Sequence, residues 1–149
     1  MEKRKSHFHN FPGSGIPKFY GMETQELTGL EIEADSLKKA YTAGEEITYS
    51  LTVKNSFAGH KVPTGDPERF FLITFKVLDA NDTIMDKKQF RIGEEWEWYP
   101  TAKKLSDNNL NPLEEREYNF VYKVPDKDNL TLVVEISKHR MTKENAKYM

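Results

Sequence analysis

Apolar and polar residues alternate along several short stretches of this chain. The clearest is residues 46–55, where every second residue is apolar: Ile47, Tyr49, Leu51 and Val53. Such period-two patterning predicts a β-strand with one buried face. Residues 116–124 and 130–138 show the same pattern, and residues 27–35 show it more weakly. Each of these segments is therefore predicted to be a strand.

Two further segments depart from simple alternation. Residues 69–79 carry apolar side chains along one face, and Phe70 and Leu72 make the other face apolar at its start. We therefore predict a strand whose beginning is buried on both sides. Residues 83–93 are strand-like but carry lysines, which predicts an edge strand because lysines commonly protect exposed sheet edges.

Turn-forming residues set the expected boundaries. Residues 79–86 are rich in Asp and Asn, which tolerate the left-handed conformation of tight turns. Residues 94–115 are predicted to form a long connection. Several prolines and glycines predict an irregular N-terminal arm over residues 1–26. A sandwich domain over residues 27–140 and a tail over residues 141–149, either frayed or a short helix, complete the expected organisation.

No segment has the periodicity of an amphipathic helix over a useful length. Strand-like segments with turns about every 8–12 residues are typical of antiparallel sandwiches. We therefore predict an all-β fold, an antiparallel β-sandwich of about six or seven strands with immunoglobulin- or fibronectin-like architecture. The Cys–Trp–Cys pattern of true immunoglobulin domains is missing because the chain has no cysteine.

Composition narrows the function classes. A length of 149 residues is typical of one domain. Although the chain is highly charged, 12% of its residues are aromatic, and these large side chains supply apolar area for a core. The net charge is −2, which gives no indication of the basic face that nucleic-acid-binding proteins use. No apolar run approaches the ~20 residues that a membrane-spanning helix needs. Without cysteine there is no disulfide, thiolate metal site, cysteine nucleophile or covalent haem attachment. The start lacks an apolar signal segment, so we expect an excised domain.

His60 is the most informative candidate for function. It lies in the segment SFAGHKVPTGDPERFF, residues 56–71. Gly59 permits a turn or a close backbone approach, Pro63 restricts the backbone beside it, and residues 64–67 predict a turn. We expect a stiff loop that presents one imidazole at an end of the sandwich. That imidazole is either a ligand or catalytic group, or an ordinary loop histidine bonded to a backbone carbonyl.

Other candidate metal ligands are weaker. His7 and His9 form a His-x-His pair whose side chains would point the same way in an extended segment. The other interpretation is a solvated N-terminal arm. The candidate metal ligands are therefore His60, His9 and His7. Three acidic residues have oxygen ligands suitable for calcium but lack EF-hand spacing: Asp66, Glu68 and Asp107.

Aromatic and acidic residues alternate in GEEWEWYP, residues 93–100. The aromatic residues are candidates for contact with a carbohydrate or a partner protein: Trp96, Trp98 and Tyr99. The acidic residues raise a glycosidase hypothesis: Glu94, Glu95 and Glu97. A charged edge whose tryptophans cover the core or a partner explains the same pattern. We rank the hydrolase last and expect no enzymatic activity.

One segment resembles the non-haem, β-rich C-terminal segment of bacterial multihaem c-type cytochromes. The matching residues, in order, are Val53, Asn55, Gly59, His60, Pro63, Thr64, Gly65, Pro67 and Arg69. Weaker similarities lie in SHFHNFPGS, residues 6–14, and in SDNNLNPLEEREYNFVYKVP, residues 106–125. The resemblance extends over residues 6–137, and its specific part is residues 55–69.

The resemblance implies a periplasmic or surface electron-transfer protein in which this domain packs on a haem-bearing domain. It also implies that loop histidines act as distal haem ligands, with His60 the first candidate and His9 the second. The haem c would belong to a neighbouring domain of the same or a partner polypeptide, because this chain lacks Cys-x-x-Cys-His. The chain also departs from the family pattern at residues 79–82, where a glycine is expected. The alternative is a free-standing module that binds a carbohydrate or a partner protein.

Overall fold

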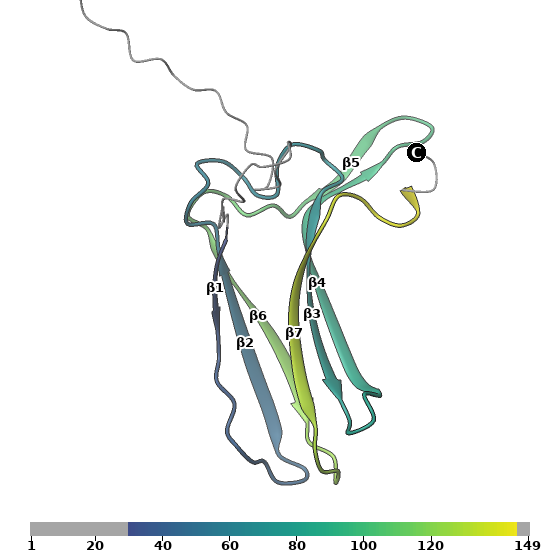
Figure 1. Cartoon of the computed structure of the whole chain (residues 1–149). Coiled ribbons are helices and arrows are strands. Elements are labelled where there is room, and N and C mark those ends of the chain that lie inside the picture. The colour runs from purple at the N-terminus through teal and green to yellow at the C-terminus, as the bar shows by residue number, and fades with distance from the viewer. Residues whose placement is uncertain (1–29, 146–149) are drawn as a thin grey trace, which may run out of the picture.

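The computed structural model describes residues 30–145, which form two antiparallel sheets packed face to face (Figure 1). The sheet orders are β1-β2-β6 and β5-β4-β3-β7. The strands are β1 (Glu31–Ala34), β2 (Glu46–Lys54), β3 (Phe70–Leu78), β4 (Ile84–Glu97), β5 (Lys103–Asp107), β6 (Glu115–Lys123) and β7 (Thr131–His139). The predicted all-β antiparallel sandwich is confirmed. The predicted arm over residues 1–26, with His7 and His9, lies outside the described residues.

The core lies between the sheets and follows from the alternation in the sequence. Every second residue of β2 is buried from Tyr49 to Val53, and the facing residues of β3 and β6 are buried too. Phe75 is the centre of this layer. Its ring stacks on Phe120 with centroids 5.6 Å apart, and the edges of Tyr49 and Phe90 approach it. Such aromatic contacts add to the stabilisation from apolar burial.

The predicted long connection over residues 94–115 is wrong. β4 continues to Glu97, and β5 returns beside it, so that the two strands form a hairpin arm that extends past the end of the sandwich (Figure 1). Every residue of β5 is exposed. A strand without a buried face does not need alternating apolar residues, which is why its sequence showed no pattern.

The lysine-rich first part of β4 is an edge, as predicted. Residues 84–93 pair only with β3, whereas β5 joins β4 only at Glu94–Glu97. The side chains of residues 84–89 are all exposed. Asp86, Lys87 and Lys88 place charges along this open edge, beside the exposed Ile84 and Met85, and these charges discourage pairing with another strand.

The start of β3 is covered on both sides, as predicted, but by polar groups on its outer face. Phe70 is buried under the ring of His139, which stacks on it with centroids 4.7 Å apart. The guanidinium of Arg91 lies 3.7 Å from the centre of the same Phe70 ring. Leu72 is only half-buried. The outer face here is therefore a stacked aromatic and cationic layer rather than a second core.

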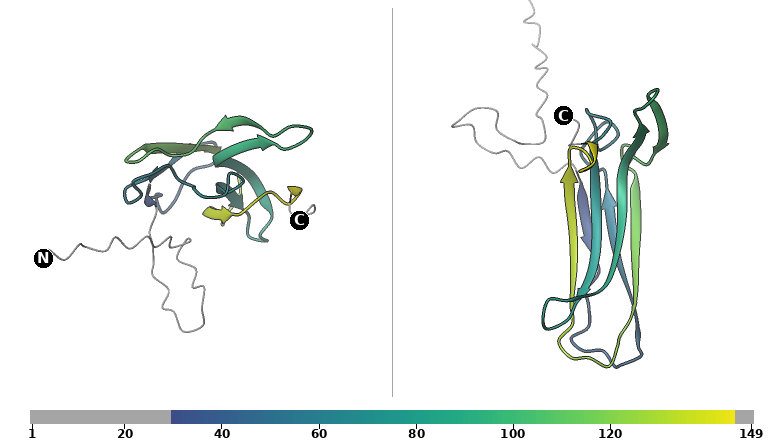
Figure 2. Two further views of the ribbon diagram at one scale, coloured as in Figure 1. Left: turned by 90° about the horizontal axis from the view of Figure 1, so that it is seen from above. Right: turned by 90° about the vertical axis from the view of Figure 1, so that its right-hand side faces the viewer.

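The described chain begins and ends at the same end of the sandwich (Figures 1 and 2). Glu31 pairs with Lys54, the last residue of β2, so β1 starts where the His60 loop starts. Near the other terminus, Asn145 donates a hydrogen bond of 2.5 Å to Glu68 of that loop. Part of the predicted tail therefore contacts the domain. Within residues 30–145, no helix is long and apolar enough to cross a membrane.

Candidate functional site

The loop between β2 and β3 holds His60 and is anchored by a buried asparagine. Asn55 is fully buried, and its amide nitrogen donates to the carbonyl oxygens of His60 at 2.8 Å, Leu110 at 3.3 Å and Asn111 at 3.1 Å. Its amide oxygen accepts from the backbone N–H of Ala58 at 3.2 Å. One side chain thus ties the His60 loop to the segment before β6.

A short antiparallel bridge joins the same two segments. Val62 and Leu110 exchange two backbone hydrogen bonds, each of 2.9 Å. Both side chains are buried in the core, and Pro63 beside them is buried as well. The backbone on either side of His60 is therefore fixed, by Asn55 before it and by this bridge after it.

The chain bends near the predicted turn at residues 64–67, but the hydrogen-bonded turn lies two residues later, where the backbone N–H of Arg69 donates to the carbonyl oxygen of Asp66 at 3.0 Å. Gly65 takes a left-handed conformation with φ of 97°, which a glycine adopts without steric cost. Arg69 reaches back across the turn and donates to the carbonyl oxygen of Thr64 at 3.2 Å. The predicted need for glycine at position 59 is not met, because Gly59 has no positive φ and an added Cβ would meet nothing within 4 Å.

His60 itself is exposed, and its ring is held by one hydrogen bond. Nδ1 lies 2.9 Å from the carbonyl oxygen of Lys61. A carbonyl oxygen can only accept, so Nδ1 carries a proton in this contact, and the neutral tautomer that fits the contact has its lone pair on Nε2. No group among residues 30–145 makes a hydrogen bond to Nε2. The backbone-bonded tautomer with a free Nε2 is the arrangement that a metal-binding histidine uses.

A salt bridge links the His60 loop to the hairpin arm. Lys61 Nζ donates to Asp107 Oδ2 of β5 at 2.9 Å, and Lys104 Nζ lies 3.7 Å from the same oxygen. The hydrogen bond from Lys61 is the main reason that the pKa of Asp107 is lowered from its ordinary value of 3.8. The residue beside His60 is thus tied to a second element.

A second anchor lies in the turn before β6. Glu114 accepts from the backbone N–H of Asn111 at 2.8 Å and forms a close ion pair with Arg116. These contacts lower the pKa of Glu114, and the hydrogen bond from the Asn111 backbone contributes more than the one from Arg116. Since Asn55 binds the carbonyl of Asn111, this turn helps to position the His60 loop.

The arm brings together the predicted aromatic residues. The indoles of Trp96 and Trp98 stack with centroids 5.2 Å apart, and Lys104 Nζ lies 5.4 Å from the Trp96 ring. Trp98 is 44% exposed and Tyr99 is 85% exposed. The arm therefore presents an aromatic surface beside the His60 end.

The three acidic residues of the arm do not converge on one point. Glu94 accepts from the Trp96 indole N–H at 2.6 Å and from Lys104 at 2.7 Å. Glu95 accepts from Ser106 at 3.1 Å, and Glu97 is exposed. Alternating residues of a strand point to opposite faces, so Glu94 and Glu95 do not form a carboxylate pair.

The two histidines among residues 30–145 are not gathered into a metal site. His139 is at the end of β7, where it stacks on Phe70 and bonds Ser137 through Nε2 at 2.8 Å. Among residues 30–145 no three His, Asp or Glu side chains lie close enough to hold a metal ion. Of the predicted metal ligands, His60 is exposed by itself, and His7 and His9 lie outside the described residues.

The structural roles of two features of the site were not predicted. Asn55 was one of the matching residues of the resemblance, but a buried amide that binds three carbonyls leaves no trace in hydrophobic patterning. The Lys61–Asp107 bridge joins residues 46 positions apart. Only the paired β4–β5 hairpin reveals it, and this hairpin was predicted as a loop.

One solved structure with a similar fold is a penta-heme cytochrome c552 from Thermochromatium tepidum. The two share a TM-score of 0.62 and 18% sequence identity, over 81% of this chain and 34% of that one. This chain thus spans about a third of the length of that cytochrome. No protein-family model and no curated protein sequence matches the chain. The likeness establishes a shared fold, and a haem protein contains that fold.

Proposed function

We propose that this chain is a β-sandwich domain of a multihaem c-type cytochrome. It packs on a haem-bearing domain, and His60 supplies Nε2 as a distal axial ligand to one haem of that domain. The order of residues from Val53 to Arg69 and the similarity in fold to a penta-heme cytochrome support this proposal. The haem carries the electron, and this chain has no cysteine to attach one covalently.

The state of His60 is the observation that carries the proposal. Its loop is fixed on both sides, its Nδ1 is bonded to a carbonyl, and its Nε2 forms no hydrogen bond with the part of the chain that the structure describes. A ligand that is already oriented loses little freedom on binding, so the fixed loop favours coordination. The backbone bond also makes Nε2 more basic, which strengthens its bond to iron.

The surface around His60 suits contact with another domain. Phe57 is 67% exposed and Leu113 is 72% exposed, and both lie beside Asn55 at the His60 end. Large exposed apolar side chains that cluster at one end of a domain mark an interaction surface. Packing a haem-bearing domain here would bury them and exclude water from the His60–iron bond.

The proposal carries two further expectations. An extracytoplasmic location follows from the resemblance to c-type cytochromes. The chain itself is assigned no reaction, because its contribution is one ligand and a packing surface. A histidine axial ligand sets the reduction potential of its haem, so His60 would tune one step of electron transfer.

The test uses the full haem-bearing protein that contains this chain. Replacing His60→Ala should convert one haem from six-coordinate low-spin to five-coordinate high-spin, seen by absorption and electron paramagnetic resonance. The potential of that haem should shift, because the axial ligand is changed. His139→Ala is the matched control, since Nε2 of His139 is already bonded to Ser137. Unchanged spin states and potentials in the His60 variant would refute the ligand role.

A second candidate function rests on the arm. The exposed faces of Trp98 and Tyr99 would let this chain bind a carbohydrate or a partner protein without any haem. Trp98→Ala should then abolish binding in a screen of oligosaccharides and co-purified proteins, while His60→Ala leaves it intact. If no partner binds through the arm, this second candidate function is refuted, and the haem-domain proposal is unaffected.

A further inference from the structure

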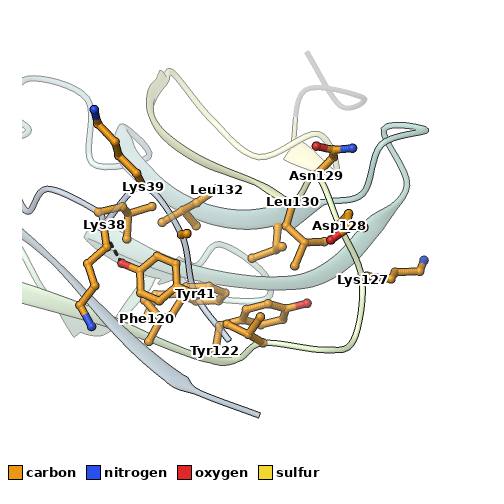
Figure 3. A pocket seen from close by; sticks show the side chains of 15 residues that line it. Lys38, Lys39, Tyr41, Phe120, Tyr122, Lys127, Asp128, Asn129, Leu130 and Leu132 are labelled. Carbon is orange, nitrogen blue, oxygen red and sulfur yellow. Dashed lines mark hydrogen bonds between the residues drawn. The ribbon is translucent and has the colours of Figure 1, made fainter. Parts of the chain in front are cut away.

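A cavity of about 440 Å³ opens between the two sheets at the end opposite His60 (Figure 3). This volume falls within the range of about 300–1,000 Å³ of small-molecule sites. One wall is aromatic and comes from β6 and the loop before β2: Tyr41, Phe120 and Tyr122. The other wall is aliphatic and comes from β3, β7 and the residue before β7: Val77, Leu130 and Leu132.

Polar contacts order the residues on each side of the cavity mouth. On one side, the backbone N–H of Lys38 donates to the Tyr41 hydroxyl at 2.9 Å, and Lys38 Nζ pairs with Glu45 at 3.0 Å. On the other side, Lys127 pairs with Asp79 at 3.1 Å. Each contact lies within one side of the mouth and helps to order that side.

The charges around the cavity cancel. Lys38 and Lys127 are each paired with a carboxylate. Lys39 and Asp128 form no salt bridge with residues 30–145, and they carry opposite charges. The charges of the lining balance and its walls are apolar, so the surroundings favour an uncharged molecule, because a charged one would lose hydration against those walls.

Two hydroxyl protons are available to a ligand. The Tyr41 oxygen accepts from Lys38, which leaves its own proton free to donate. The Tyr122 hydroxyl has no hydrogen-bond partner in the described part of the chain, and burial raises its pKa, so it keeps its proton. A ligand with an oxygen acceptor would match these donors.

We propose that this cavity binds an uncharged, planar molecule of one or two fused rings that carries a hydrogen-bond-accepting oxygen. The rings contact Tyr41 and Tyr122 with one face and Leu130 and Leu132 with the other, above the buried Phe120. The oxygen accepts from Tyr41 or Tyr122. This site is independent of His60, which lies at the far end of the strands.

The probe is 2-acetylnaphthalene, with 2-naphthoate as a charged molecule of the same ring system. In an NMR titration of the full chain, the neutral probe should saturate at one equivalent and shift the amide signals of Leu130 and Leu132. The anion should bind at least tenfold more weakly. Absence of saturable binding, or equal affinity for the anion, overturns the proposal.

Ala40→Trp tests the location of the site. Ala40 lines the cavity and is exposed, so a larger side chain there fills the mouth without disturbing the core. Binding of 2-acetylnaphthalene should weaken at least tenfold. Ala102→Trp makes the same change at an exposed position of the arm and should leave binding unchanged. Equal binding by the two variants also overturns the proposal.

Discussion

Asn55 illustrates how one side chain can position a whole loop. It is fully buried, yet it is the only residue whose amide reaches His60, Leu110 and Asn111 together within the described chain. A buried amide is stable only when its polar atoms are bonded, and the loop supplies those bonds. The geometry of His60 therefore depends on a residue that never meets solvent.

Replacing Asn55→Ala should lower the free energy of unfolding by about 2–4 kcal/mol, because buried carbonyl groups lose their donor. Urea unfolding would measure this loss. Asn119→Ala is the control, since Asn119 is exposed on β6, and its effect should stay within about 0.5 kcal/mol. Equal losses in the two variants would contradict the role of Asn55.

The Lys61–Asp107 bridge predicts a response to acid. The pKa of Asp107 is lowered in the folded state, so its contribution to stability is present above the unfolded pKa and is lost as pH falls through the folded one. The link between loop and arm should therefore loosen only below about pH 4. NMR titration of the Asp107 carboxyl carbon would show this.

Lys61→Met should raise the pKa of Asp107 toward 3.8, since the hydrogen bond from Lys61 is the main cause of its lowering. Lys39→Met is the control, because Lys39 pairs with no residue between 30 and 145. An Asp107 pKa that stays the same in Lys61→Met would show that the bridge does not form in solution.

At the scale of elements, strands that bury one face were predictable and the arm was not. β2 and β6 alternate because one face of each lies against the core. The arm has no core to bury, so β5 shows no alternation. The position of the His60 loop could be predicted from the strands on each side. Its contacts could not, since they join segments about 50 residues apart.

Strands β3 and β4 approach each other closely at Gly93. An added Cβ there would lie 2.7 Å from the Cβ of Phe70 and 2.9 Å from the carbonyl oxygen of Arg69. Gly93→Ala should therefore push β4 from β3 and destabilise the domain by about 1–3 kcal/mol. Gly59→Ala, where an added Cβ meets nothing, should be close to neutral. Thermal unfolding of both variants would separate the two cases.

At the scale of the whole molecule, the C-terminal residues pack beside the arm. Thr142 and Asn145 line a small hollow together with Trp96 and Trp98. The chain has two tryptophans, both on the arm, so tryptophan emission reports this region directly. The tail is therefore part of the arm's environment.

Ending the chain after Arg140 should uncover the tryptophans, because it removes Thr142 and the Asn145–Glu68 hydrogen bond. Quenching of their emission by acrylamide should increase. Ending the chain after Asn145 keeps these contacts and is the control. Identical quenching of the two truncated chains would show that the tail does not cover the arm.

Leu30 and Asn145, the two ends of the described chain, lie at the same end of the sandwich as His60. A domain that packs against this end of the sandwich and is covalently joined to this chain would therefore be tethered near the imidazole. Its effective concentration at His60 would be on the millimolar scale, so that ligation becomes an intramolecular step. If His60 is the proposed ligand, a bond between Nε2 and iron with a dissociation constant well below this concentration would stay occupied, whereas the same two domains as separate proteins would dissociate on dilution.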